Sequence, residues 1–486
     1  MWVHLLLALV GAAIVWSCSS GGGGGSTPTV PWSTFQANSL RSGISTGLVG
    51  TNAGTATRLF QVSTGRPTLS SPVIGRFGIV IGTTTGVLAL TTRGEFRWSF
   101  ESYSRKCLRS ATACHSDDQC TAGDTCGGCT VCAAGTPGCI SVGPINGSPS
   151  VAASGDIVVG TEGGQVFGLV DDGKSNMVTC VWVAHAEDQT FGPVRSSPGI
   201  VINTSDATIS AASLGTDKGF LVALNGLSGD QIWRFPPGDS LGAITSSPAL
   251  AGNGTSFITA PDGSLRAISS TGVQLWQAQV GTSVSDVDFL PSPAFGPSVY
   301  ATGPDGDAGV IVAVTVNGTV KWRVPTDAPV LGSPIYGQRT VTVVATPSAT
   351  PGPPPTPTPT PPTTFDTVVY AIDTNGTLYG VRDQTGQLIV DPPVFVAGSP
   401  PGVESSPVLS GDVYVVVVGT DGRLYASTID GTSPCNPPTG TPTPSKCEWP
   451  VSVGAPFVSS PILNTDGRIY VTAADGFLYL IGTPFS

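Results

Sequence analysis

The stretch Ser406–Ala426 reads SPVLSGDVYVVVVGTDGRLYA and contains the pattern that decides the fold. Its Ser-Pro pair opens an apolar strand, Val413 to Val418 forms a second strand, and Asp421-Gly422 turns into a third. Glycine at such a turn supplies the positive φ that a tight hairpin needs. The last repeat has the same order, with the same 15-residue distance from Pro461 to Gly476. The chain is therefore built from a repeated antiparallel sheet motif.

The phrase Ser-Pro followed by an apolar strand occurs eight times along the 486-residue chain. Most intervals between its prolines are 41 to 54 residues, and the two longer ones, of 77 and 73 residues, contain inserts of foreign composition. A fourth strand in most repeats contains a tryptophan, which suits a large apolar plate between neighbouring sheets. The prolines are Pro72, Pro149, Pro198, Pro248, Pro293, Pro334, Pro407 and Pro461.

Four short antiparallel strands per repeat describe one blade of a propeller, and a single blade cannot bury its apolar face without neighbours. We therefore predict an all-β fold, an eight-bladed β-propeller of four-stranded antiparallel blades. The last repeat stops at Ser486 without its fourth strand, so we expect Thr57 to Thr64 to close the ring as an N-terminal strand. The tryptophans expected to pack between blades are Trp98, Trp182, Trp233, Trp276, Trp322 and Trp449.

Two inserts interrupt the repeats. The Cys-rich insert, residues 101–146, is too small to bury a core, so disulfides would staple it. It is either a binding knob or a stabilised loop without a function of its own. The Pro/Thr-rich insert, residues 346–364, has too few apolar side chains to fold and should be extended. It is either a peptide ligand for a partner or a tolerated spacer.

Cysteine use indicates an oxidising compartment. Apart from one cysteine near the N-terminus the chain has ten, an even number that five disulfides would require. The spacing of Cys126, Cys129 and Cys132 would suit an iron-sulfur cluster, but the ferredoxin continuation is missing. A haem attachment is excluded as well, because no histidine follows the Cys-x-x-Cys pairs.

The insert holds seven of these cysteines, so one of them must pair outside it. We expect its partner to be Cys180, and we expect Cys435 to pair with Cys447. The disulfide candidates are Cys107, Cys114, Cys120, Cys126, Cys129, Cys132, Cys139, Cys180, Cys435 and Cys447.

The N-terminus has the marks of export. Leu5 to Val15 is an apolar run too short to span a bilayer, so residues 1–17 are expected to be a signal peptide. The segment that ends at Cys18 resembles a bacterial lipobox, in which the cysteine is lipidated. Residues 18–31 would then be a lipid anchor and Gly/Ser tether at the outer membrane, and residues 32–486 the propeller. The alternative is ordinary secretion with Cys18 as a stray thiol.

Composition argues against several function classes. The formal charge is -11, from 32 acidic and 21 basic residues, so electrostatic binding to nucleic acid or to an acidic membrane is disfavoured. The three histidines, His4, His115 and His185, leave little room for His-based metal sites or triads. Acidic turns such as Asp305-Gly306-Asp307 lack the spacing of a calcium loop. We therefore predict no catalytic residue and no metal site.

The repeat resembles the pyrroloquinoline-quinone-like (PQQ-like) family, whose pattern runs Ser-Ser-Pro, apolar strand, Asp-Gly, Tyr-Ala-Leu-Asp and Gly-x-x-x-Trp. The third repeat shows the last part as Ala223-Leu224-Asn225, Ser228-Gly229 and Trp233. The segment Trp32–Gly43, WSTFQANSLRSG, resembles the lead-in of the family. The resemblance implies an eight-bladed propeller but no single function.

Three functions are compatible with this resemblance. Quinoprotein dehydrogenases of the family hold PQQ in a central funnel, commonly over a disulfide between adjacent cysteines, with calcium bound by Glu, Asn and Asp; no two cysteines are adjacent here. A BamB-like outer-membrane protein assembly factor is lipid-anchored and non-catalytic, but the resemblance gives no counterpart for the two inserts. We favour a third interpretation, a non-catalytic envelope lipoprotein that acts as a protein-protein interaction scaffold through its loops and inserts.

The favoured interpretation implies an unidentified protein partner and a monomeric propeller. It implies contact with the membrane only through the N-terminal lipid, and no binding of nucleic acid. No cofactor is expected, because PQQ and calcium belong only to the dehydrogenase alternative.

Overall fold

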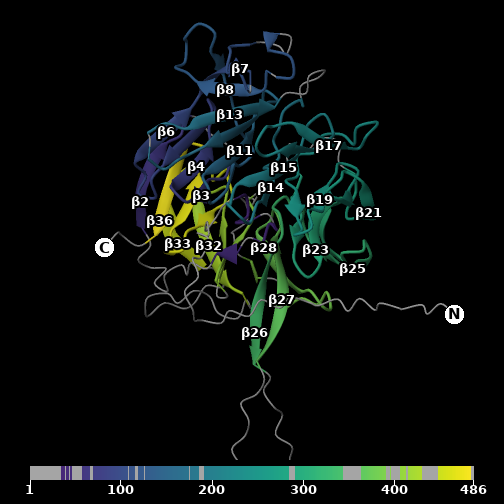
Figure 1. The fold of residues 1–486 in the computed structure, drawn as a ribbon. Helices are drawn as coiled ribbons and strands as arrows, with labels where there is room; N and C mark the ends of the chain where they lie inside the picture. The colour runs from purple at the N-terminus through teal and green to yellow at the C-terminus, as the bar shows by residue number, and fades with distance from the viewer. Residues whose placement is uncertain are drawn as a thin grey trace, which may run out of the picture.

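The secondary structure of this chain consists of β-strands in the part that the computed structural model describes (Figure 1). Across these residues, no helix is long and apolar enough to cross a membrane. The described segments are 34–38, 40–42, 44–45, 57–65, 69–107, 109–114, 119–124, 126–174, 176–184, 191–283, 290–342, 363–389, 394–395, 405–411, 414–429 and 447–482.

The strands form eight sheets, of which the first four come from residues 73–279. The first sheet contains β3 (Val73–Gly75), β4 (Gly78–Gly82), β5 (Val87–Leu90) and β6 (Phe96–Phe100). The second contains, in spatial order, β10 (Ser150–Val151), β11 (Asp156–Gly160), β12 (Val166–Val170), β13 (Thr179–Ala184), β8 (Gly128–Val131), β7 (Ser102–Lys106) and β9 (Ile140–Ser141). The third contains β14 (Gly199–Ile202), β15 (Ile209–Gly215), β16 (Leu221–Asn225) and β17 (Gln231–Phe235). The fourth contains β18 (Ala249–Leu250), β19 (Ser256–Thr259), β20 (Ser264–Ile268) and β21 (Gln274–Gln279).

The other four sheets include the two that recruit strands from the N-terminal part of the chain. The fifth contains β22 (Ala294–Phe295), β23 (Val299–Asp305), β24 (Ala308–Val314) and β25 (Val320–Thr326). The sixth contains β26 (Ile335–Thr342), β27 (Thr363–Ile372), β28 (Thr377–Arg382) and β29 (Val394–Phe395). The seventh contains β1 (Ile44–Ser45), β30 (Val408–Ser410), β31 (Tyr414–Val418), β32 (Arg423–Thr428) and β33 (Cys447–Ser452). The eighth contains β34 (Ile462–Leu463), β35 (Ile469–Thr472), β36 (Phe477–Gly482) and β2 (Thr57–Ser63).

These sheets are the four-stranded antiparallel blades of a β-propeller, as the sequence predicted. The predicted number of eight blades is not confirmed. Six sheets have four strands, but the seventh has five and the second has seven. A count of blades gives seven rather than eight. The sheets are unequal because the Cys-rich insert adds β7, β8 and β9 to the second sheet and the N-terminal segment adds β1 to the seventh.

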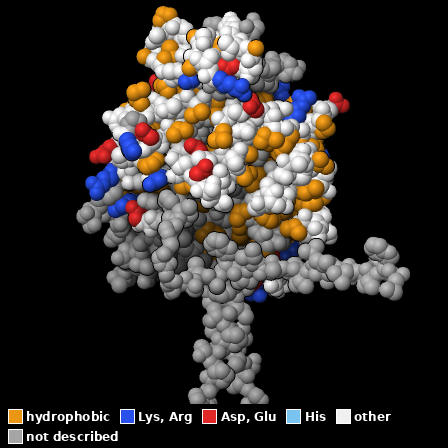
Figure 2. All heavy atoms as spheres, viewed as in Figure 1, with side chains coloured by type: hydrophobic (Ala, Val, Ile, Leu, Met, Phe, Trp, Pro, Cys, Tyr) orange, Lys and Arg blue, Asp and Glu red, His pale blue; other side chains and the backbone are white. Residues whose placement is uncertain are grey.

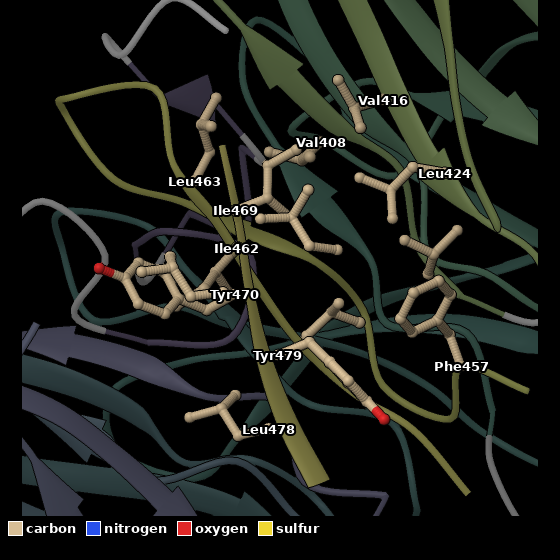
Figure 3. Packing of buried hydrophobic residues seen from close by; sticks show 14 of the residues in the cluster. Val408, Val416, Leu424, Phe457, Ile462, Leu463, Ile469, Tyr470, Leu478 and Tyr479 are labelled. Atoms are coloured by element: carbon tan, nitrogen blue, oxygen red, sulfur yellow. The ribbon is translucent and has the colours of Figure 1, made fainter. Parts of the chain in front are cut away.

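Each sheet is joined to its neighbours by apolar packing. Figure 3 shows Val408 of the seventh sheet near Ile469 of the eighth, and both belong to one cluster of buried side chains. The same cluster continues into the first sheet through Ile79 and other buried side chains. Full burial of an aliphatic side chain stabilises the fold by about 2 kcal/mol. The eighth sheet is thus packed between the seventh sheet and the first.

The N-terminal strand closes the array, as predicted. Strand β2 pairs antiparallel with β36, with register from Thr57 opposite Gly482 to Ser63 opposite Phe477. Leu59, Phe60 and other apolar side chains of β2 pack against the cluster shared by the first, seventh and eighth sheets. The last sheet therefore gains its outermost strand from the opposite end of the chain.

The Cys-rich insert and the hairpin that flanks the Pro/Thr-rich insert both project from the body of the molecule. In Figure 1, β7 and β8 lie above the other strands of the second sheet, and the hairpin of β26 and β27 projects from the opposite end. This hairpin is in register from Ile335 opposite Tyr370 to Thr342 opposite Thr363. Most of the predicted Pro/Thr-rich insert, residues 346–362, lies outside the described residues.

Deleting residues 57–64 should lower the free energy of unfolding by more than about 3 kcal/mol, because β36 would lose its partner and the cluster its β2 side chains. Urea unfolding followed by tryptophan fluorescence measures this change. Deletion of residues 21–25 in the Gly/Ser tether is the matched control and should leave stability unchanged. An unaltered unfolding curve for the 57–64 deletion would contradict the closure.

Candidate functional site

The Ser-Pro phrases meet in a closed ring of hydrogen bonds. The N–H of each serine donates to the hydroxyl of the serine that opens the next sheet, at N···O distances of 2.8 to 3.1 Å. The last of these bonds runs from Ser460 back to Ser71 and closes the ring. In chain order its members are Ser71, Ser148, Ser197, Ser247, Ser292, Ser333, Ser406 and Ser460. We call this set the serine ring.

The serine ring lines a cavity of about 380 Å³, which we call the axial cup. Its volume lies in the range of small-molecule sites, about 300 to 1,000 Å³. Apolar side chains share the lining with the serines, among them Phe35, Leu69, Leu331 and Phe457. The cup is therefore a concave site at the centre of the array, with both hydroxyl and apolar walls.

The N-terminal segment 34–45 lies beside the cup and binds the inner strands of several sheets. The carbonyl of Leu40 accepts a hydrogen bond from the N–H of Phe295 in β22, at 2.8 Å. The carbonyl of Ser42 accepts another from Tyr336 in β26, at 3.2 Å. Further along, β1 pairs in parallel with β30. We call this segment the axial plug, because it joins consecutive sheets from the middle of the ring.

Arg41 fixes the plug to two further sheets. Its guanidinium donates to the carbonyls of Phe35 (2.6 Å), Ser197 (3.0 Å), Pro198 (3.2 Å) and Pro248 (3.2 Å). The side chain is fully buried, and burial lowers the pKa of the guanidinium to about 9, so the group stays charged at neutral pH. No carboxylate forms an ion pair with Arg41 among the residues that the structure describes.

The sequence contained one signal for the plug, the resemblance of Trp32–Gly43 to the lead-in of the PQQ-like family. It did not indicate that this segment enters the ring, because the segment has no strand periodicity. Figure 1 places the N-terminal part of the chain, drawn in purple, among the inner strands.

Arg41→Met should lower the free energy of unfolding by about 3 kcal/mol, because four buried carbonyls lose their donor while the side-chain volume is kept. Urea unfolding measures the loss. Arg234→Met is the matched control, since Arg234 is exposed and its guanidinium lies 4.8 Å from the centre of the Phe220 ring. Equal stability of the two variants would contradict the role given to Arg41.

One ionisable side chain in the lining of the cup, Arg195, is already neutralised. Its Nε lies 3.1 Å from Oε1 of Glu162, and its Nη1 lies 3.4 Å from Oδ2 of Asp217. Asn146, also in the lining, donates to the same Glu162 oxygen at 2.7 Å. The wall around Arg195 therefore has no excess positive charge.

This lining does not fit a calcium-bound quinone. The resemblance requires calcium ligands from Glu, Asn and Asp and a disulfide of adjacent cysteines. Among the described residues that line the cup there is no carboxylate and no cysteine, and the amide of Asn146 is bound to Glu162. The donor set for the metal is thus missing from this lining.

The predicted blade-packing tryptophans donate hydrogen bonds from one sheet to the next. Trp182 binds the carbonyl of Gly226 (2.9 Å), Trp233 that of Ser270 (2.8 Å), Trp276 that of Val316 (2.8 Å) and Trp322 that of Asp383 (2.7 Å). Each bond runs from the indole Nε1 to the turn that precedes the fourth strand of the following sheet.

Trp98 has the strongest form of this contact. Its Nε1 donates to Oδ2 of Asp171 at 3.1 Å, and Arg97 forms a bidentate pair with the same carboxylate at 2.6 and 2.9 Å. Trp98 and Asp171 are both buried. Trp449 lies in β33, but its side chain is outside the described residues. The packing role of the six tryptophans stays a prediction.

Trp98→Phe should cost about 2 kcal/mol of unfolding free energy, because a buried carboxylate loses one donor and the cavity of the indole stays partly empty. Trp233→Phe should cost less than half as much, since the Trp233 bond is open to solvent. Thermal unfolding of both variants gives the comparison. A smaller loss at Trp98 than at Trp233 would exclude the buried contact as the stronger one.

The Cys-rich insert forms a disulfide-bonded knob, as the sequence predicted. The pairs are Cys107–Cys120, Cys114–Cys126, Cys129–Cys180 and Cys132–Cys139. The expected bond to Cys180 is present and ties the knob to β13. Cys107, Cys114 and Cys120 lie close enough to hold a metal ion, but their sulfurs are oxidised and offer no thiolate.

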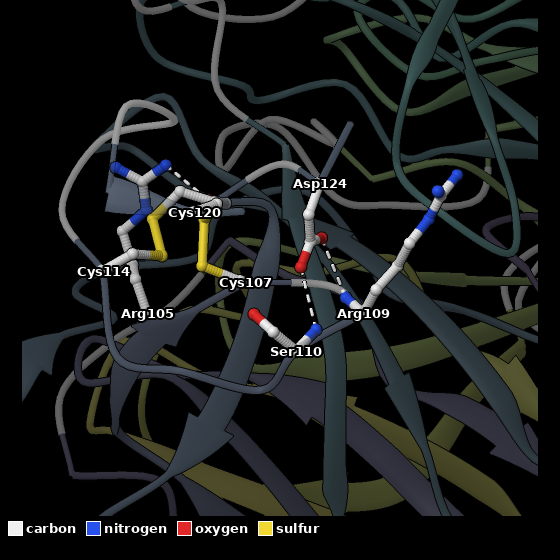
Figure 4. The surroundings of a disulfide bond; sticks show 8 residues. Arg105, Cys107, Arg109, Ser110, Cys114, Cys120 and Asp124 are labelled. Carbon is white, nitrogen blue, oxygen red and sulfur yellow. Dashed lines mark hydrogen bonds between the residues drawn. A yellow bond between two sulfur atoms is a disulfide. The ribbon is translucent and has the colours of Figure 1, made fainter. Parts of the chain in front are cut away.

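Asp124 supports the loop of the knob by accepting hydrogen bonds from the N–H groups of Arg109 (2.9 Å) and Ser110 (2.8 Å), as Figure 4 shows. Cys18, Cys435 and all three histidines lie outside the described residues, as does the side chain of Cys447. Lipidation at Cys18 and the Cys435–Cys447 bond therefore stay predictions.

The carboxylates of the turn aspartates accept hydrogen bonds from residues of their own hairpins. Asp421 accepts from the N–H of Arg423 at 3.1 Å and from the hydroxyl of Tyr425. Asp475 is bound in the same way by Phe477 and Tyr479. Repetition of one contact in two neighbouring sheets indicates an architectural role for these carboxylates.

Repeated Ser-Pro openings, tryptophans in the fourth strands and closure by an N-terminal strand define a PQQ-like repeat β-propeller. A family model described as outer membrane protein assembly factor BamB matches residues 84–291 and 261–352, together more than half of the chain. The chain therefore belongs to this family.

Solved structures agree with this fold. BamB from Moraxella catarrhalis matches with a TM-score of 0.52 and 15% sequence identity, over 89% of this chain and 98% of that chain. The computationally designed Ika8 protein matches with a TM-score of 0.52 and 12% identity, over 87% of this chain and 99% of that chain. At such identities the likeness shows the fold alone. A search of curated proteins gives no match.

Proposed function

We propose that this chain is a non-catalytic lipoprotein of the bacterial envelope that serves as a protein-protein interaction scaffold, in the manner of an outer-membrane protein assembly factor. Membership of the family described as assembly factor BamB is the observation that carries the proposal. Such a role needs a rigid body that presents loops to a partner, and the propeller with its projecting knob and hairpin supplies one.

In this proposal the eight sheets are eight blades of a single ring. Support comes from the serine ring, in which eight hydrogen bonds join eight Ser-Pro phrases and the last returns to the first. The seven-stranded second sheet then counts as one blade whose outer edge is extended by the knob.

A quinone-dependent dehydrogenase is the weaker candidate, because the lining of the axial cup does not fit PQQ with calcium. The two functions differ in what purified protein should carry. A quinone absorbance band together with alcohol or aldose oxidation would overturn the scaffold proposal.

The partner is tested by crosslinking the tagged full-length protein in intact cells and identifying captured proteins by mass spectrometry. We expect outer-membrane proteins or components of their assembly machinery to be enriched over a tagged periplasmic control. Equal recovery of all envelope proteins with both baits would contradict a specific scaffold. A variant without residues 104–139 tests whether the knob contributes, since binding through the knob predicts loss of the partner.

Lipidation at Cys18 would place the scaffold at the membrane surface. Growth with radiolabelled palmitate should label the wild-type protein and leave Cys18→Ser unlabelled, with the variant released into the soluble envelope fraction. Cys435→Ser is the matched control and should remain labelled. Equal labelling of the wild type and Cys18→Ser would refute the anchor.

A further inference from the structure

The hydroxyls of the serine ring have unused donors. Each oxygen accepts one main-chain hydrogen bond, which leaves the O–H and one lone pair. Within the described residues, none of the eight hydroxyls donates a hydrogen bond to another protein group. Seven of the eight serines are buried, and all eight line the axial cup. Because these O–H donors converge on one cavity, the cup suits a guest that brings acceptor oxygens.

A positive charge lies directly beneath this lining. The Arg41 guanidinium donates to the carbonyls of Phe35 and Ser197, and both of these residues line the cup. Its centre lies 5.5 Å from the centroid of the Phe35 ring. No described carboxylate pairs with Arg41, so no direct ion pair cancels its charge beneath the cup. The guest should therefore carry negative charge.

The rest of the wall is apolar. Phe35, Leu331 and Phe457 line the cavity together with Leu69, whose side chain is 43% exposed. A small inorganic anion would leave this apolar surface exposed to water. A group that joins an oxyanion to an apolar side chain would use both the hydroxyl donors and the apolar wall.

We infer that the axial cup binds the C-terminal end of a partner polypeptide, with its carboxylate on the serine hydroxyls and its last apolar side chain against Phe35 and Leu69. Capture of a terminal carboxylate by converging donors is a known mode of peptide recognition. The inference rests on the proposed scaffold function and names the part of the partner that the scaffold holds.

The binding test uses fluorescein-labelled pentapeptides that end in Ala, Leu or Phe, titrated with the full-length protein and followed by fluorescence anisotropy. At least one peptide with a free carboxylate should bind saturably, with a Kd on the order of 100 µM or tighter. The same peptide with an amidated C-terminus should bind at least about tenfold more weakly, because the amide has no negative charge.

Two matched variants place the site. Leu69→Trp fills the cup and should abolish binding, whereas Leu227→Trp introduces the same side chain at a 67% exposed turn and should bind like the wild type. Thermal unfolding checks that both variants are folded. Equal affinity for free and amidated peptides, equal binding by the two variants, or no peptide binding at all would overturn the inference.

Other guests are excluded by competition. Glucose, inorganic phosphate and PQQ are each tested against the bound peptide, and saturable binding of one of them that Leu69→Trp abolishes, without peptide binding, would assign the cup to that chemistry instead. Crosslinking with the Leu69→Trp variant distinguishes failure of the inferred C-terminus binding from failure of the scaffold function. Loss of the partner supports the inference, whereas a partner retained by Leu69→Trp contradicts it and leaves the scaffold function intact.

Discussion

The serine ring is the interaction on which the rest of the molecule depends. Apolar packing between sheets supplies most of the stability, but it is non-directional and does not by itself set the angle between neighbours. Each serine N–H donates sideways to the next repeat, and the proline that follows has no N–H to compete for that acceptor. The pair therefore fixes the spacing of the sheets while the strands that follow bury their apolar faces. This explains why the same two residues open every repeat.

A ring of this kind gathers main-chain carbonyls near its axis. The axial plug supplies donors for several of them, and Arg41 binds four carbonyls from the plug itself and from two sheets. An arginine suits this position better than a lysine, because its planar group offers five N–H donors in fixed directions. The plug also provides Phe35, so a segment that precedes the first repeat becomes part of the cup that the repeats surround.

The repeat architecture could be predicted because its signals are periodic. The spacing of the Ser-Pro phrases predicted the repeated sheets. The lack of a fourth strand in the last repeat predicted its pairing with β2, and the odd number of cysteines in the insert predicted a bond to Cys180. The prediction of four strands in every blade was wrong for the second sheet, because the knob adds β7, β8 and β9 to its outer edge. No local pattern in residues 102–141 indicates this pairing. The plug and the acceptors of the tryptophans depend on contacts between distant repeats, which neither periodicity nor composition encodes.

Pairing of β2 with β36 has a consequence for biogenesis. The two strands come from opposite ends of the polypeptide, and Thr64 binds the carbonyl of Gly476 across a separation of 412 residues. Contacts of such high order form late, because the chain entropy of the whole loop must be lost first. During synthesis the N-terminal strand is made first and has no partner until the C-terminal strand follows, so the edge of β36 and the face of β2 meet last. The ring therefore stays open until nearly the whole chain has been made.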